Sequence, residues 1–414
     1  MFPPDASAGP ASRFAAFRHR SFALYWAARF SSTFAVQVVS VSVGWQVYDI
    51  TRNPLDLGFV GLLQFLPALL LVFVTGAAAD RYKRRSIMAI AAATEAVCAI
   101  FLIVYTLRGA GSVLPVFAAL LVFGSARAFF NPAQSSLVVN LIPQSDLANA
   151  IAWNSSAWQV AAIVGPVAGG LLYGVGPLAA YGTAAAMFLA ATCLVLMIRQ
   201  PDQKTVKTPV SWSEVVAGLS YIRREKVVLG AISLDLFAVL LGGATALLPV
   251  YARDILDLGP WGLGLLRSAP GVGAVCIAVF LAMRPIRTHA GMMMFICVFG
   301  FGAFAVVFGL SKTVWVSIVA LAMMGALDMV SVFVRETLIQ LWTPDDVRGR
   351  VNAVNMVFVG ASNELGEFRA GVMAALIGTV AAVAVGGVGT MAIAAIWAKA
   401  FPDLRRIQHL DSRD

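Results

Sequence analysis

The amino-acid sequence predicts an all-α integral membrane protein with twelve transmembrane helices in two related six-helix halves. Three observations support this fold class. Hydrophobic residues make up 60% of the chain, charged residues only 12%, and the mean hydropathy is +0.83. Apolar runs of about 20 residues, the length that crosses a bilayer, recur along the whole chain. Two segments in different halves, 137–154 and 338–355, share one pattern of Leu, Pro, Ala and Asn.

Each expected span is a predominantly apolar run bounded by polar connections. The expected domains are an N-terminal six-helix bundle at 1–199, a linker at 200–226 and a C-terminal six-helix bundle at 227–414. The twelve expected spans are about 21–48, 55–79, 86–107, 112–137, 149–174, 178–198, 227–251, 259–283, 290–310, 314–340, 347–374 and 379–400.

The basic residues predict the orientation of these spans. Most of the 30 Lys and Arg fall in the connections that share a side with both termini. Arg52, Arg108, Arg253 and Lys312 each stand alone in a connection on the other side. Because positive charge is retained in the cytoplasm, we expect a multi-pass protein of the bacterial inner membrane with both termini cytoplasmic. The net charge of +9 is then a membrane signature, and we expect no nucleic-acid partner.

Cysteine and histidine usage gives no sign of a metal or a redox site. Each of the four cysteines lies alone in a different apolar run, and the three histidines lie in hydrophilic connections. No pair has disulfide or metal-ligand spacing, so we read the cysteines as small core residues. The start of the chain also lacks the pattern of a cleaved signal peptide, which leaves the first apolar run as a membrane helix.

The linker between the halves predicts a short amphipathic helix. Ser211 and Glu214 have the spacing of a capping box, and apolar residues follow at helical intervals from Val215 to Ile222. We expect this helix to lie on the cytoplasmic face. In the second half, Thr343 and Pro344 form a helix-start pattern that should begin the eleventh span.

A short polar connection follows the second span and reads GAAADRYKRRS at 76–86. It resembles the loop signature of the major facilitator superfamily, with matches at Gly76, Asp80, Arg81, Arg84 and Arg85 and a lysine at the second glycine position. The resemblance implies the superfamily's fold of two pseudo-symmetric bundles. We expect a cytoplasmic latch in which Asp80 meets the positive start of helix eleven and Arg84 orients it.

Helix five contains a proline flanked by glycines. Gly165, Pro166, Gly169 and Gly170 are similar to the signature of superfamily exporters that act as proton antiporters, although Ala161 replaces its usual first glycine. Proline and glycine together imply a bend and a close helix contact. Ordinary helix packing is the alternative. The runs 335–340, 343–350 and 362–371 resemble a bacterial branch that includes siderophore exporters and macrolide efflux proteins.

Ionisable residues inside the spans are the candidates for coupling, since such groups usually face a cavity or a partner. Arg29 and Arg127 lie in the first half and Asp235 and Asp328 in the second. A carboxylate that contacts Arg29 or Arg127 in one conformation only would change its proton affinity during transport. We expect Asp235 and Asp328 to carry the proton, with Glu364 as the next candidate. A static ion pair is the alternative, and Arg335 lies near Asp328 on the same helix.

Two polar stripes at helical spacing predict the wall of a central cavity. The alternative for their uncharged members is hydrogen bonding between helices. Arg267, Glu364, Glu367 and Arg369 border the expected interface between halves, where either gating or static packing fits. The stripes comprise Arg29, Thr33, Gln37 and Ser40 on helix one, and Arg127, Asn131 and Gln134 on helix four.

These features predict a secondary active transporter, a proton-coupled exporter of small amphipathic molecules such as drugs or siderophores. The alternatives are a lysophospholipid flippase of the same fold, or a non-transporting receptor or scaffold. No phosphate-cradling loop or catalytic set is recognisable, so we expect no enzyme activity and no cofactor, with the proton gradient as energy source. The expected partners are a small-molecule substrate, protons and the lipid bilayer, and we expect a functional monomer.

Overall fold

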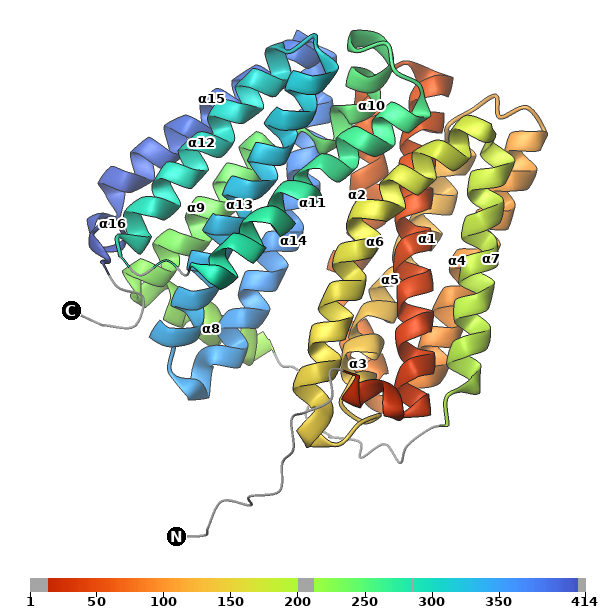
Figure 1. Cartoon of the computed structure of the whole chain (residues 1–414), viewed down its shortest axis with the longest axis horizontal. Coiled ribbons are helices and arrows are strands. Elements are labelled where there is room, and N and C mark those ends of the chain that lie inside the picture. Colours follow the sequence, from red (N-terminus) through yellow and green to blue (C-terminus); the bar gives the residue numbers. More distant parts are fainter. Residues whose placement is uncertain (1–13, 200–211, 285, 287, 409–414) are drawn as a thin grey trace.

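The computed structural model describes residues 14–199, 212–284, 286 and 288–408, and every regular element in these residues is a helix (Figure 1). This confirms the predicted all-α class. Among the described residues, nine helices are long and apolar enough to cross a membrane, and a bent pair brings the number to ten. Helices α1 and α14, with 32 and 33 residues, are also long enough to cross a membrane but carry many polar side chains. The number of twelve transmembrane spans therefore remains a prediction, and the order of the helices along the chain is compatible with it.

The N-terminal half contains seven α-helices because its second span is divided. Figure 1 shows them in red to yellow-green. They are α1 Arg20–Thr51, α2 Pro54–Leu70, α3 Val72–Arg81, α4 Arg84–Leu107, α5 Leu114–Val138, α6 Leu147–Val175 and α7 Pro177–Met197.

The C-terminal half follows in green to blue, and α8 Trp212–Arg224 precedes it in the sequence. Ser211 of the expected capping box lies outside the described residues. The helices of this half are α9 Lys226–Gly242, α10 Leu248–Val250, α11 Pro260–Met283, α12 Ala290–Leu310, α13 Val314–Trp342, α14 Asp345–Ile377, α15 Thr379–Ala400 and α16 Pro402–Arg406.

Two spans are broken rather than continuous. In the second, α2 ends at Leu70 and meets the main part of α3 at 58°. In the seventh, α9 ends at Gly242, and a short 3₁₀ turn, Thr245–Leu247, leads into α10 and a π-helical turn, Tyr251–Ile255. π-Turns often occur at functional sites, where they reposition side chains.

Helix α8 packs against the beginning of α14 and α9. Ile222 is fully buried with Val228 and Val351, and the Tyr221 hydroxyl donates to the carbonyl of Trp342 over 3.0 Å. Helix α14 begins at Asp345, within two residues of the predicted start. Pro344 occupies the N-cap position, however, and no side chain caps this helix, so the expected capping role of Thr343 is wrong.

The two halves lie side by side, and their helices spread apart toward α8 and converge toward α10 (Figure 1). We call these two ends of the molecule the α8 end and the α10 end. Helix α6 packs against α11, and α2 against α14. A hydrophobic cluster joins Val41 and Trp45 of α1 to Leu248 and Tyr251 of the broken seventh span. The halves are therefore sealed by apolar packing at the α10 end.

Glycines allow the close approach at both interfaces. A Cβ on Gly264 of α11 would lie 2.4 Å from the carbonyl oxygen of Pro166 in α6, and one on Gly170 would lie 2.4 Å from that of Pro260. At the other interface, a Cβ on Gly58 of α2 would lie 3.0 Å from the carbonyl oxygen of Phe368. Any larger residue would push the helices apart.

Candidate functional site

A polar cavity of about 400 Å³ lies between the two halves. Helices α1, α2 and α5 line it from the N-terminal half, and the broken seventh span, α11 and α14 line it from the C-terminal half. Its size falls within the range of small-molecule sites. The polar side chains in its wall are Gln37, Ser40, Gln64, Arg127, Asn131, Thr245, Arg267, Glu364 and Glu367.

Four of these side chains can carry a charge, two of them basic and two acidic. Glu364 and Glu367 are three residues apart on α14, so they share one face of that helix. Both carboxylates reach toward α2, where a Cβ on Gly61 would lie 3.0 Å from an oxygen of each. The absence of a side chain at Gly61 leaves space for both carboxylates in the cavity.

The guanidinium groups face these carboxylates from two other helices. Arg127 projects from α5, and Arg267 of α11 donates a 2.8 Å hydrogen bond to the Ser40 hydroxyl across the boundary between halves. Within the described part of the chain, neither arginine forms an ion pair within 4 Å. The cavity therefore presents two donors for oxygen-rich anionic groups and two acceptors for protons or cations.

The structure brings together only part of the predicted cavity wall. Gln37, Arg127, Asn131 and Glu364 line the cavity, as does Ser40. The others predicted for it, Arg29, Thr33 and Gln134, are not among its lining residues.

Gln134 contacts α1 outside the cavity, where its backbone carbonyl accepts a 3.0 Å hydrogen bond from the Tyr25 hydroxyl. Two polar side chains of the cavity wall were not predicted, Gln64 and Thr245. Gln64 could have been found as the amide in an otherwise apolar run. Thr245 could not, because its position depends on the break in the seventh span.

Asp235 and Asp328 lie inside the C-terminal half, away from this cavity. They share a small enclosed space with Ser331 and Cys297 between α9, α12 and α13. Asp235 forms a buried ion pair with Arg335 of α13. In this conformation the cation that contacts Asp235 is Arg335, rather than the expected Arg29 or Arg127. The contact is therefore of the kind given above as the alternative, an ion pair within one half.

The predicted latch residues lie where α3 ends and α4 begins. Asp80 forms no ion pair within the described residues, and Arg84 donates to the carbonyls of Ser136, over 2.8 Å, and Ala79, over 3.3 Å, instead of orienting Asp80. Arg85 donates to the carbonyl of Ile198 over 2.8 Å. These cations tie α4 to neighbouring helices of their own half, so the latch between halves stays a prediction for another conformation.

The glycines and proline of α6 form the close contact predicted for them. A Cβ on Gly165 would lie 2.6 Å from Cβ of the cavity residue Gln37, and one on Gly169 would lie 3.0 Å from Cα of Val38. Together with Gly170 at the α11 interface, they place α6 against α1 and against the opposite half at once.

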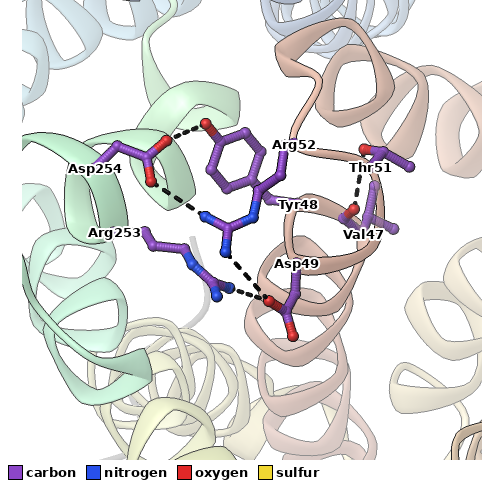
Figure 2. Close-up of polar contacts among 7 residues, drawn as sticks. All are labelled: Val47, Tyr48, Asp49, Thr51, Arg52, Arg253 and Asp254. Carbon is purple, nitrogen blue, oxygen red and sulfur yellow. Dashed lines mark hydrogen bonds and ion pairs between the residues drawn. The ribbon is translucent and has the colours of Figure 1, made fainter. Parts of the chain in front are cut away.

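At the α10 end a cluster of charged residues joins the two halves (Figure 2). Asp49 at the end of α1 pairs with Arg253 of the π-turn, and Asp254 of the same turn accepts from Tyr48 and, over 3.4 Å, from Arg52. We call these five residues the outer cluster. Sequence reasoning missed it, because Arg52 and Arg253 were assigned to separate connections.

The outer cluster lies directly beyond the cavity. Gly44 and Pro249 line the cavity, and Tyr48 and Arg253 follow about one turn further along the same segments. The Arg253 guanidinium also lies over the ring of Trp45, 5.3 Å from its centre. Polar bridges and the apolar layer beneath them close this end of the cavity.

Two helical bundles with a charged cavity between them are the architecture of a secondary membrane transporter. A family model described as "Transmembrane secretion effector" matches residues 11–413, so the chain belongs to this family of major facilitator transporters. It is therefore a multi-pass membrane transporter and not an enzyme.

Similarity to known exporters spans nearly the whole chain. The chain is 24% identical over 393 residues to the enterobactin exporter EntS of Escherichia coli O1:K1 / APEC. It has the same identity to the enterobactin exporter EntS of Shigella boydii serotype 18. Each alignment covers 94% of this chain and 94% of the relative.

Solved transporters share the fold. A bacterial homologue of the human lysosomal transporter Spinster, inward-facing and unoccupied, superposes with a TM-score of 0.71 at 13% identity, covering 96% of this chain and 97% of that one. An inward-facing bacterial homologue of the iron transporter ferroportin gives a TM-score of 0.69 at 16% identity, covering 94% and 99%.

Proposed function

We propose that the protein is a proton-coupled exporter of small amphipathic molecules in the bacterial inner membrane. The observation that carries this proposal is the cavity between the halves, in which Glu364 and Glu367 face Arg127 and Arg267. In this proposal both termini lie in the cytoplasm, so the outer cluster closes the outer side of the cavity. The proposed state is then inward-facing and accepts substrate from the cell. The full-length similarity to enterobactin exporters supports export and favours oxygen-rich substrates such as siderophores.

Glu364 is the proton-coupling residue of this proposal, with Glu367 as its neighbour. A carboxylate buried near another carboxylate holds a proton more readily, whereas a nearby guanidinium favours its ionised form. A substrate group that binds Arg127 or Arg267 would take that cation from the carboxylates and so change their affinity for protons. Asp235 is less suited to this role, because Arg335 already neutralises it inside one half.

Transport into inside-out vesicles tests the proposal. Vesicles that contain the protein are given an acidic lumen and screened with a panel of siderophores, macrolides and lysolipids. Export predicts accumulation that depends on the pH gradient and stops when the gradient is collapsed. Lysolipid movement alone would favour a flippase, and no gradient-dependent uptake of any compound would overturn the proposal.

The proton role has its own test. Glu364→Gln is expected to abolish gradient-driven accumulation while substrate exchange at equal pH survives, because exchange needs the site but no net proton movement. Asp235→Asn serves as the comparison. If Glu364→Gln retains the full response and Asp235→Asn, verified by thermal unfolding to be folded, loses it, the coupling group is Asp235.

A further inference from the structure

A second cavity of about 820 Å³ opens on the flank of the N-terminal half, apart from the central cavity. It is a groove between α4 and α5 that begins beside the end of α3. Its floor is mostly apolar, with Ile87, Ile90, Val122 and Phe129 among the lining residues. Ile90 and Val122 are 68% and 49% exposed. In a transmembrane bundle, exposed apolar side chains of this kind face lipid.

The mouth of this groove is basic. Arg81, Tyr82, Lys83 and Ser86 line it at the α8 end. Within the described residues, Arg81 and Lys83 form no ion pair with a carboxylate, and Arg81 lies over the ring of Tyr82 at 5.9 Å. This contrasts with Arg84 and Arg85 in the same connection, which are bound to backbone carbonyls.

The dimensions of the groove match one leaflet of a bilayer. From Lys83 at the start of α4 to Thr94 on the floor, the helix rises roughly 16 Å at 1.5 Å per residue. This is about half of the ~30 Å hydrocarbon core. The charged mouth would therefore lie at the level of the lipid phosphates, and the floor at the level of the acyl chains.

We propose that this groove binds one anionic phospholipid, with its phosphate between Arg81 and Lys83 and an acyl chain along the floor toward Thr94. The groove and an anionic lipid are complementary in charge, because Arg81 and Lys83, which form no ion pair with a carboxylate of the described residues, stand above an apolar groove open to the membrane. Since Arg81 and Lys83 lie in the connection that contains Asp80, the bound lipid would contact the segment expected to act between the two conformations. The proposal is independent of the transported substrate.

Native mass spectrometry of the full-length protein in detergent tests this site by titration with phosphatidylglycerol or phosphatidylcholine. We expect tighter binding of phosphatidylglycerol. Lys83→Gln is expected to weaken it about fivefold, the ratio that about 1 kcal/mol per basic residue at an anionic surface gives. Binding of phosphatidylcholine should fall less, because its choline cation offsets the charge of its phosphate. Arg108→Gln, which removes an exposed cation from the other end of α4, is the matched control and should change neither.

The floor is tested separately. Thr94→Trp fills the groove and should reduce binding of both lipids, whereas Val97→Trp, on the same helix but outside the groove and 64% exposed, should not. Thermal unfolding of each variant verifies that it is folded. Equal affinity for both lipids, equal behaviour of Thr94→Trp and Val97→Trp, or displacement of phosphatidylglycerol by millimolar inorganic phosphate would each overturn the proposal.

Discussion

The outer cluster predicts that a single substitution will shift the balance between the two conformations of the transporter. The change is Arg253→Gln, which removes the charge of the π-turn residue that reaches across to α1. Its partners, Asp49 and the ring of Trp45, both belong to the other half. These contacts exist only while the α10 end is closed, so their loss should destabilise the closed state and leave the open state unaffected.

The magnitude follows from the exposure of the groups. The side chains of Arg253 and Asp49 are 25% and 50% exposed, so water screens their ion pair and its contribution is about 0.2–1 kcal/mol. The cation–π contact adds about 0.5–1 kcal/mol. A total of about 1–2 kcal/mol changes the ratio of the two states about 5- to 30-fold. The bonds of Asp254 to Tyr48 and Arg52 remain, so the closed state is weakened rather than abolished.

Distance measurement between spin labels can detect this shift. Labels are attached to cysteines introduced at Gly111 and Val380, one in each half at the α10 end, where an added Cβ at Gly111 meets nothing closer than 3.9 Å. The background replaces the four native cysteines, Cys98, Cys193, Cys276 and Cys297. Arg253→Gln should enlarge the population with the longer distance.

The control is Lys312→Gln, which removes an exposed cation from the same end that forms no ion pair within the described residues. It should leave the distance distribution unchanged. Two results would refute this prediction. The first is that Arg253→Gln gives the same distance distribution as this control. The second is that adding Asp49→Asn to the Arg253→Gln variant shifts the distribution as much as Asp49→Asn shifts it in the otherwise unchanged protein.

Three further changes test other contacts. Gly170→Ala should lower stability by about 1–3 kcal/mol in thermal unfolding, because the new methyl would lie 2.4 Å from a carbonyl oxygen of α11, whereas Gly174→Ala on the same helix meets nothing within 4 Å and should be neutral. Asp235→Asn should reduce the free energy of unfolding by about 3–5 kcal/mol by breaking the buried ion pair of Arg335, whose other carboxylate contact, Glu336, is 3.8 Å away and exposed, and adding Arg335→Gln should recover much of that loss. Asp80→Asn should leave the label distances at the α10 end unchanged in this conformation but slow transport; an unchanged transport rate would contradict the latch.

Much of the fold could be predicted because the bilayer imposes a strong constraint. Apolar runs of fixed length and basic connections locate the helices without any knowledge of their contacts. The close contact at Pro166 was predictable too, because the glycines beside this proline let a neighbouring helix approach closely, whichever helix that is. The break in the seventh span was not predicted: the run up to Val250 is apolar enough for a continuous helix, although Gly242, Gly243 and Pro249 are residues that interrupt helices.

The candidate site was harder to predict, because it depends on which helix faces which. Helical spacing placed Gln37 and Arg127 on polar stripes, and both line the cavity. The same spacing could not show that Gln37 and Ser40 of the α1 stripe line the cavity whereas Arg29 and Thr33 do not. It also could not choose between cavity and core for the carboxylates. Asp235 lies against Arg335 within one half, whereas Glu364 faces the opposite half across Gly61.

The balance of charge in the central cavity has an electrical consequence. With Glu364 and Glu367 ionised, their charges and those of Arg127 and Arg267 sum to zero, so the empty carrier can reorient without moving net charge at this site. A carrier that has taken up one proton moves a charge of +1, worth about 2.3 kcal/mol per 100 mV of membrane potential if it traverses the whole field. The membrane potential would then act on the proton-loaded carrier, and its influence on turnover would depend on the charge of the substrate.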